Sequence, residues 1–180
     1  MIRRHHLALI AVTTLAWTGT VQAHKPHQHG LAKLDIAYEA GKLTIELDSP
    51  LDSLVGFERA PRTDAERKSV DDAVARLRAG QTMFVIDPAA GCSLEGVELA
   101  SAPLGLGGAG APAEKDGHAD LEGRWTFACS GAAPAFVDVG LFGAFRRMNR
   151  LEVQVVSDKG QRKVTLRRAA GAAPRVELPR

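Results

Sequence analysis

The feature that most constrains this fold is the alternation of apolar and polar side chains over residues 31–47. Apolar residues fill every second position on both sides of Ala40-Gly41, a dipeptide typical of a tight turn. Because successive side chains of a strand point to opposite faces, this pattern predicts a β-hairpin with one buried face. Residues 151–166 repeat the pattern around a turn that ends at Gly160, so a second hairpin is expected.

The one strong helix signal lies at residues 64–79. Thr63 is a suitable N-cap, Glu66 is placed for a capping box, and apolar residues recur at helical spacing until Gly80. Further strands are predicted at residues 83–86, 92–100, 121–129 and 136–141. The sequence therefore predicts an α+β fold: a mostly antiparallel sheet of six to seven strands with one amphipathic helix.

Residues 1–23 have the organisation of a cleavable export signal. Arg3 and Arg4 precede a short apolar run, and small residues lead to a cleavage site after Ala23. The apolar run is well short of the roughly twenty residues of a transmembrane helix, and no later segment reaches that length. We therefore expect a periplasmic protein, secreted through a cleaved N-terminal signal peptide, whose mature chain is not inserted in the membrane.

A single α+β domain is expected over residues 24–168. Within it, residues 103–117 are rich in Gly, Ala and Pro and have little to bury, which predicts an exposed, mobile loop. A similar composition over residues 169–180 predicts a frayed tail.

Charge argues against two classes of partner. Without Arg3 and Arg4, 21 of the 23 basic residues remain, against 21 acidic residues. A chain balanced in this way lacks the basic surface that nucleic acid or an anionic membrane would require.

Cys92 and Cys129 are the two cysteines of the chain. An even number of cysteines in an exported protein predicts a disulfide, worth roughly 4 kcal/mol in the chain-entropy model. A thiolate metal site or a redox pair is the alternative, although the two residues are too far apart for a Cys-x-x-Cys motif.

Histidines gather at the start of the expected mature chain. If the first strand extends back to His27, then His27 and His29 point to one face and can share an ion. Neutral imidazole suits Zn²⁺, Cu²⁺ and Ni²⁺. His24, as a new N-terminus, could add its amine and ring to a copper site, but Pro26 lacks the amide proton that a wrapped copper motif needs. The alternative is a histidine-bearing terminus with no defined site.

Three more residues could complete a tetrahedral set of ligands. His118 and Asp120 share a face if the strand at 121–129 begins early, and Glu58 lies in an apolar connection. The alternatives are a solvated loop-end histidine beside a strand-capping aspartate, and a Glu58 side chain paired with Arg59. Signatures of catalysis, such as Gly-x-Ser-x-Gly, His-Glu-x-x-His or a phosphate loop, are absent from the sequence, so we do not expect an enzyme.

Several short motifs follow one another in a characteristic order: His27-Gln28-His29-Gly30, Leu54-Val55-Gly56-Phe57-Glu58, Ala90-Gly91-Cys92, His118-Ala119-Asp120-Leu121, Phe127-Ala128-Cys129, Leu141-Phe142-Gly143-Ala144-Phe145 and Gly160-Gln161. Through them, over about residues 27–167, the chain resembles the ZrgA-like family of bacterial periplasmic zinc-binding proteins. The resemblance implies a protein that helps zinc uptake, passing the ion to a transporter component. It also implies that His27, His29, His118 and Asp120 occupy metal-ligand positions.

This chain departs from the family pattern in two places. Relatives carry a His/Asp/Glu-rich insert before the His-x-Asp motif, whereas residues 105–117 contain no histidine. Relatives commonly have histidine after Gly-Phe-Glu, where this chain has Arg59, which would repel a nearby cation. The departures leave room for one defined metal site at most.

Four functions are compatible with the sequence. The first is a non-catalytic zinc-binding protein that holds one ion through His27, His29 and His118, with Asp120 or Glu58 as fourth ligand. The second is an interaction or structural protein that has lost metal binding, and the third is an exported copper-binding protein. The fourth is a zinc hydrolase with Glu58 as base, for which the sequence offers little.

Overall fold

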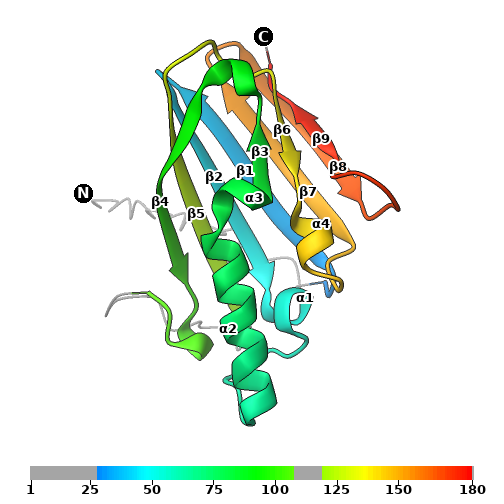
Figure 1. Ribbon diagram of the computed structural model, residues 1–180. Coiled ribbons are helices and arrows are strands. Elements are labelled where there is room, and N and C mark those ends of the chain that lie inside the picture. Colours follow the sequence, from blue (N-terminus) through cyan, green and yellow to red (C-terminus); the bar gives the residue numbers. More distant parts are fainter. Residues whose placement is uncertain (1–27, 108–118, 180) are drawn as a thin grey trace, which may run out of the picture.

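A six-stranded mixed sheet forms the larger layer of the computed structural model, which describes residues 28–107 and 119–179. Its strands lie in the order β4-β5-β2-β1-β7-β8 (Figure 1). The parallel pair is β1 with β7, and every other neighbouring pair is antiparallel. The bounds are β1 (Leu31–Glu39), β2 (Lys42–Pro50), β4 (Cys92–Ala100), β5 (Asp120–Cys129), β7 (Arg150–Ser157) and β8 (Gly160–Arg167).

A smaller antiparallel sheet and the helices pack on one face of the larger sheet (Figure 1). The smaller sheet has the order β3-β6-β9, with β3 (Phe84–Ile86), β6 (Phe136–Val139) and β9 (Arg175–Glu177). The helices are α1 (Leu51–Val55), α2 (Asp64–Arg78), α3 (Gly80–Met83) and α4 (Leu141–Ala144), with short 3-10 turns at Pro88–Ala90 and Ala102–Leu104. Within the described residues, no helix is long and apolar enough to span a membrane.

The core lies between these two layers and is built from the alternate, inward-facing residues of the long strands. Trp125 on β5 is fully buried, its ring meets Phe84 edge-on at 4.9 Å, and its indole N–H donates to the Leu77 carbonyl at 2.8 Å. These contacts join the large sheet to the start of the small sheet and to the end of α2. The hydrogen bond matters because a buried indole N–H without an acceptor would cost about 1–3 kcal/mol.

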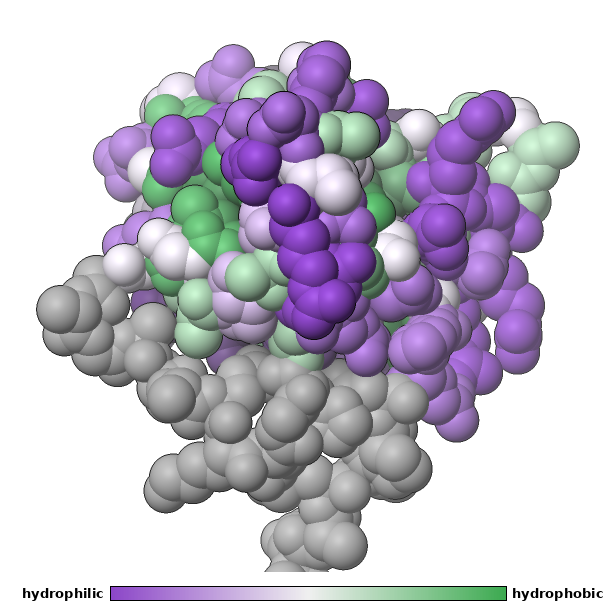
Figure 2. Space-filling model, turned by 90° about the horizontal axis from the view of Figure 1, so that it is seen from below, coloured by the Kyte–Doolittle hydropathy of each residue, from purple (hydrophilic) through white to green (hydrophobic). Residues whose placement is uncertain are grey.

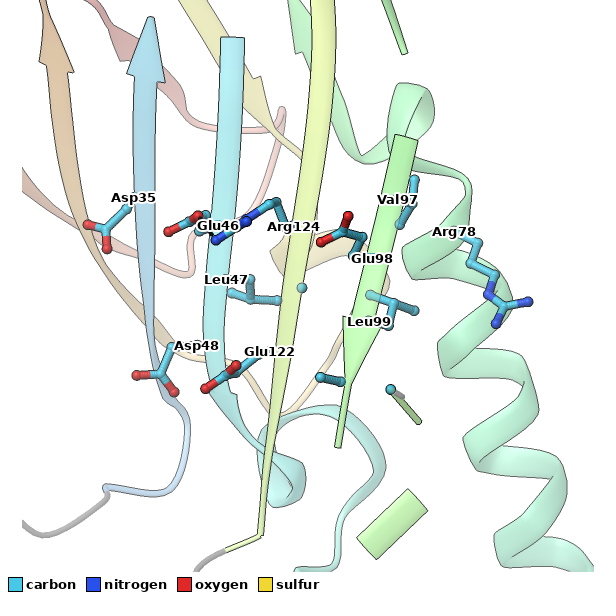
Figure 3. Close-up of a pocket in the computed structure, with 13 residues that line it drawn as sticks. Asp35, Glu46, Leu47, Asp48, Arg78, Val97, Glu98, Leu99, Glu122 and Arg124 are labelled. Atoms are coloured by element: carbon cyan, nitrogen blue, oxygen red, sulfur yellow. Dashed lines mark ion pairs between the residues drawn. The ribbon is translucent and has the colours of Figure 1, made fainter. Parts of the chain in front are cut away.

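The opposite, outer face of the large sheet carries charged side chains, and no described helix or strand covers it. A depression of about 760 Å³ is lined by carboxylates from β1, β2, β4 and β5, and also by the inward-facing Leu47 and by Arg78 of α2. Figure 3 shows these side chains along the four strands and the helix. Several of the charges are paired across strands, as Lys33 is with Asp48 and Arg124 with Glu46. Burial, together with the nearby carboxylates of Glu46 and Asp48, raises the pKa of Asp35.

The structure confirms the α+β fold class, both hairpins and the long helix. Ala40 and Gly41 form the first turn with positive φ angles of 49° and 80°. Helix α2 begins after Thr63, whose hydroxyl accepts from the Glu66 N–H at 3.2 Å, as a capping box requires. The disulfide between Cys92 and Cys129 joins directly opposed residues of β4 and β5.

Other expectations need correction. The tail at 169–180 is not frayed throughout, because β9 joins the small sheet and buries Val176 and Leu178. The apolar connection after Pro50 is helix α1. The start of the expected loop at 103–117 is ordered by a bridge between Ser101 and Leu106, and residues 108–118 lie outside the described residues.

Candidate functional site

Helix α1 brings two distant stretches of the chain together. The backbone N–H of Gly30, which follows His29, donates to the Ser53 hydroxyl at 3.0 Å. At the start of the same helix, the Leu51 N–H donates to the carbonyl of Ala119, the residue after His118, at 2.8 Å. The sequence could not show that these stretches meet, and the structure places their described ends on one five-residue helix.

His29 lies in a turn and not in a strand. The first strand begins at Leu31, whose N–H donates to the Gln28 carbonyl at 3.0 Å, so β1 does not extend back through His29 as the sequence allowed. Gly30 has a φ angle of 77°, which favours glycine and ends the extended backbone. Its carbonyl accepts from the N–H groups of Asn149 and Arg150 at 2.7 and 2.9 Å, which fixes the turn to the start of β7.

The imidazole of His29 lies between two carboxylates. Its Nε2 atom is 3.3 Å from Oε1 of Glu58, and its Nδ1 atom is 3.9 Å from Oδ2 of Asp52. The His29 side chain is 67% exposed, whereas Asp52 and Glu58 are 19% and 30% exposed. The ring is therefore accessible to an ion, and the carboxylates are held against the protein.

The spacing of His29 and Glu58 fits two ligands of one zinc ion. Zinc–ligand bonds of 2.0–2.1 Å in a tetrahedron place neighbouring ligand atoms about 3.3–3.4 Å apart. Two donors do not complete such a site. In the part of the chain that the structure describes, no group of three or more His, Cys, Asp or Glu residues is arranged to hold a metal ion.

Glu58 is free to face His29 because Arg59 has another partner. The Arg59 guanidinium donates to both carboxylate oxygens of Glu66 at 2.8 and 2.9 Å and lies over the Phe57 ring. The expected pairing of Glu58 with Arg59 is therefore not what the structure shows. Because Glu66 neutralises Arg59, the cation is a weaker obstacle to a metal ion than the sequence implied.

Asp120 is the third described residue that the sequence offers as a ligand, beside His29 and Glu58. It begins β5 on the outer face of the sheet, since the next residue, Leu121, is buried in the core. The pKa of Lys33 is raised, chiefly by its hydrogen bond to Asp48 and in smaller part by the charge of Asp120. Among described residues, the charged partners of His29 are Asp52 and Glu58.

The remaining candidate ligands divide into two groups. His24, His27 and His118 lie outside the described residues. Cys92 and Cys129 are joined by an S–S bond of 2.08 Å, and the described residues contain no free cysteine, so a thiolate metal site at this pair is excluded.

Sequence reasoning missed Asp52. It stands in Leu51-Asp52-Ser53-Leu54-Val55, part of the apolar connection that leads to Glu58, and a five-residue helix is too short to show periodicity. The available signal was Pro50 with an acidic residue two positions later, a combination typical of a helix start. The end of the molecule that carries α1 faces the viewer in Figure 2, where hydrophilic side chains surround a smaller apolar area.

Comparison with known proteins adds a family to this geometry. A family model described as ZrgA family zinc uptake protein matches residues 26–176. A comparison with individual curated proteins gives no match. The matched range contains the His29 turn, helix α1, Glu58 and both cysteines of the disulfide. Because this match covers most of the sequence, the chain belongs to the ZrgA family of zinc uptake proteins.

Proposed function

We propose that this protein binds a zinc ion in the periplasm and contributes to zinc acquisition without catalysing a reaction. The family description supports a role in zinc uptake. The observation that carries the proposal is the 3.3 Å separation between Nε2 of His29 and Oε1 of Glu58, which is the spacing of two ligands on one tetrahedral ion.

The rest of the coordination shell is expected from the sequence. His27 precedes His29 by two residues, and His118 precedes Ala119, whose carbonyl accepts from helix α1. These two imidazoles with His29 and Glu58 would make a four-ligand set of nitrogen and oxygen donors, a composition that suits zinc.

An exposed site of this kind suits relay of the ion. The His29 side chain is 67% exposed, so the bound ion would remain accessible to a second protein. We therefore propose that the protein buffers zinc and passes it to a component of a zinc transporter.

Calorimetric titration of the untagged chain lacking residues 1–23 tests this function. The wild type should bind one zinc ion at about pH 7.5. His29→Ala should weaken binding by at least about 100-fold, since loss of an outer-shell partner alone costs about 10–100-fold. Glu58→Gln should also lower the zinc affinity. His27→Ala and His118→Ala test the two ligands that are expected from the sequence.

Two controls sharpen the titration. Glu95→Gln changes an exposed carboxylate on β4 and should leave the affinity unchanged. At about pH 5.5 the wild type should bind about tenfold more weakly for each imidazole ligand, because imidazole binds metal only when neutral and its ordinary pKa is about 6.5. Equal affinity at both pH values would contradict ligation by imidazoles, and no zinc binding at all would favour an interaction protein that has lost the metal.

A further inference from the structure

We propose that Arg168 is a positioning residue for the candidate zinc site: its guanidinium holds the loop at residues 145–149, and this loop sets the separation between His29 and Glu58. This role rests on the proposed function. Arg168 directly follows β8, about 140 residues after His29 in the chain, and takes part in none of the motifs named above.

The Arg168 guanidinium donates to three backbone carbonyls on the path from α4 to β7. Its Nε atom donates to the Met148 carbonyl at 3.0 Å, and Nη1 donates to the Phe142 carbonyl at 2.6 Å. Nη2 donates to the Met148 carbonyl at 2.6 Å and also to the Phe145 carbonyl. The guanidinium lies 5.6 Å from the centroid of the Phe142 ring, which adds a cation–π contact.

These three carbonyls have little access to water. Phe142, Phe145 and Met148 are 6%, 2% and 0% exposed. A buried carbonyl without a donor is costly, and the end of a helix leaves its last carbonyls without partners inside the helix. A planar guanidinium presents five N–H donors in a fixed geometry, whereas the lysine ammonium is a point donor. Arg168 therefore determines the path of the chain between α4 and β7.

The same segment holds the turn that carries His29. The backbone N–H of Arg168 donates to the Asn149 carbonyl at 2.9 Å. The N–H groups of Asn149 and Arg150 in turn donate to the Gly30 carbonyl at 2.7 and 2.9 Å. The packing is close, since a Cβ added at Gly30 would come within 2.8 Å of Nδ2 of Asn149. A displaced loop would therefore displace the turn.

The loop also contacts the stretch that leads to Glu58. The Arg147 guanidinium lies against Gly56, where an added Cβ would come within 2.8 Å of Nε. Gly56 precedes Glu58 by two residues, so one loop touches both stretches that carry the candidate ligands. The 3.3 Å separation between His29 and Glu58 then depends on the loop that Arg168 holds.

The test compares Arg168→Lys with the wild type, in the untagged chain lacking residues 1–23. The first measurement is hydrogen exchange of the Asn149 and Arg150 amides in metal-free protein, relative to amides of the β1–β2 hairpin. Lysine keeps the charge but cannot serve three carbonyls, so exchange should be at least about tenfold faster. The second is zinc affinity at about pH 7.5, which should fall about 10- to 100-fold, as for loss of an outer-shell partner.

Arg175→Lys is the matched control. Arg175 also lies over an aromatic ring, 3.4 Å from the centroid of Phe136, and donates to both carboxylate oxygens of Asp138, but it belongs to the small sheet. This variant should lower thermal stability and leave both measurements unchanged. If Arg168 served folding alone, the two arginine variants would have the same zinc affinity.

Phe142→Leu is a second, milder variant. It removes the ring beneath the Arg168 guanidinium and leaves the three carbonyls in place, so both measurements should shift in the same direction as in Arg168→Lys, by less. Unchanged amide exchange in both variants overturns the inference, whatever the zinc affinity. Faster exchange with wild-type zinc affinity also overturns it and leaves the proposed function standing. If the wild type binds no zinc, the proposed function fails, and the exchange rates still decide whether Arg168 holds the turn.

Discussion

At the scale of single residues, Glu58 and Arg59 are neighbours in sequence with different partners in space. Glu58 lies against His29, and Arg59 donates to Glu66 on α2. Adjacent opposite charges made a Glu58–Arg59 pair the simpler interpretation of the sequence. Sequence could identify Glu58 as a candidate ligand, but the competing partner of Arg59 comes from another element and only tertiary structure brings it within reach.

Stability in acid should depend on Glu66. Hydrogen bonds from Arg59 and from the backbone N–H of Arg62 hold the pKa of Glu66 at about 2, below its ordinary value of 4.5. Because the folded-state pKa is the lower one, the ionised group stabilises the fold above about pH 4.5, and this contribution is lost as the pH falls towards 2. In thermal melts, Glu66→Gln should therefore unfold a few degrees below the wild type at pH 7 and approach it at pH 2.

A second variant tests the cause of this pH dependence. Arg59→Gln removes the same ion pair and should reproduce part of the loss at pH 7, while the exposed Glu95→Gln should follow the wild type throughout. A difference between Glu66→Gln and wild type that stays constant down to pH 2 would contradict the interpretation.

At the scale of secondary structure, the long elements were predictable and the short ones were not. The alternation over nine residues in β1 and in β2 and the capping signals of α2 are local, so they identify these elements without knowledge of the rest. Helix α1 has five residues and is bonded to residues 30 and 119. Strand β9 has three residues and pairs with β6. Their formation depends on tertiary contacts that local sequence does not encode.

The C-terminal segment offers a test at this scale. Leu178 is 4% exposed, and its N–H donates to the Ala135 carbonyl at 2.9 Å. Leu178→Ala should lower the free energy of unfolding by about 2–4 kcal/mol, since it opens a cavity beneath the small sheet. Chemical denaturation would measure this, with the exposed Ala172→Ser as control. No change in Leu178→Ala would mean that the tail is frayed after all.

At the scale of the whole molecule, the disulfide and the candidate site lie at opposite ends of β5. Asp120 begins this strand next to helix α1, and Cys129 ends it, about 30 Å away at 3.3 Å per residue. Sequence predicted both features, yet it could not place them, because the convergence of residues 30 and 119 on α1 is a property of the complete sheet.

This separation predicts that stability and zinc binding respond independently to loss of the disulfide. In the double variant Cys92→Ala/Cys129→Ala, the free energy of unfolding should be lower by roughly 3–4 kcal/mol, because the unfolded chain is no longer closed into a loop. Its zinc affinity at 25 °C, where it remains folded, should match the wild type. A parallel loss of affinity would show that the two ends are coupled.

The hydrogen bonds that fix the His29 turn also set the order in which the site can be assembled. Gly30 accepts from Asn149 and Arg150, and β1 pairs in parallel with β7, which is made long after β1 during synthesis. A nascent chain that ends before β7 cannot form this turn, however many of its histidines have already emerged. The metal loading that we propose would therefore follow completion of the fold, because an incomplete chain lacks this turn.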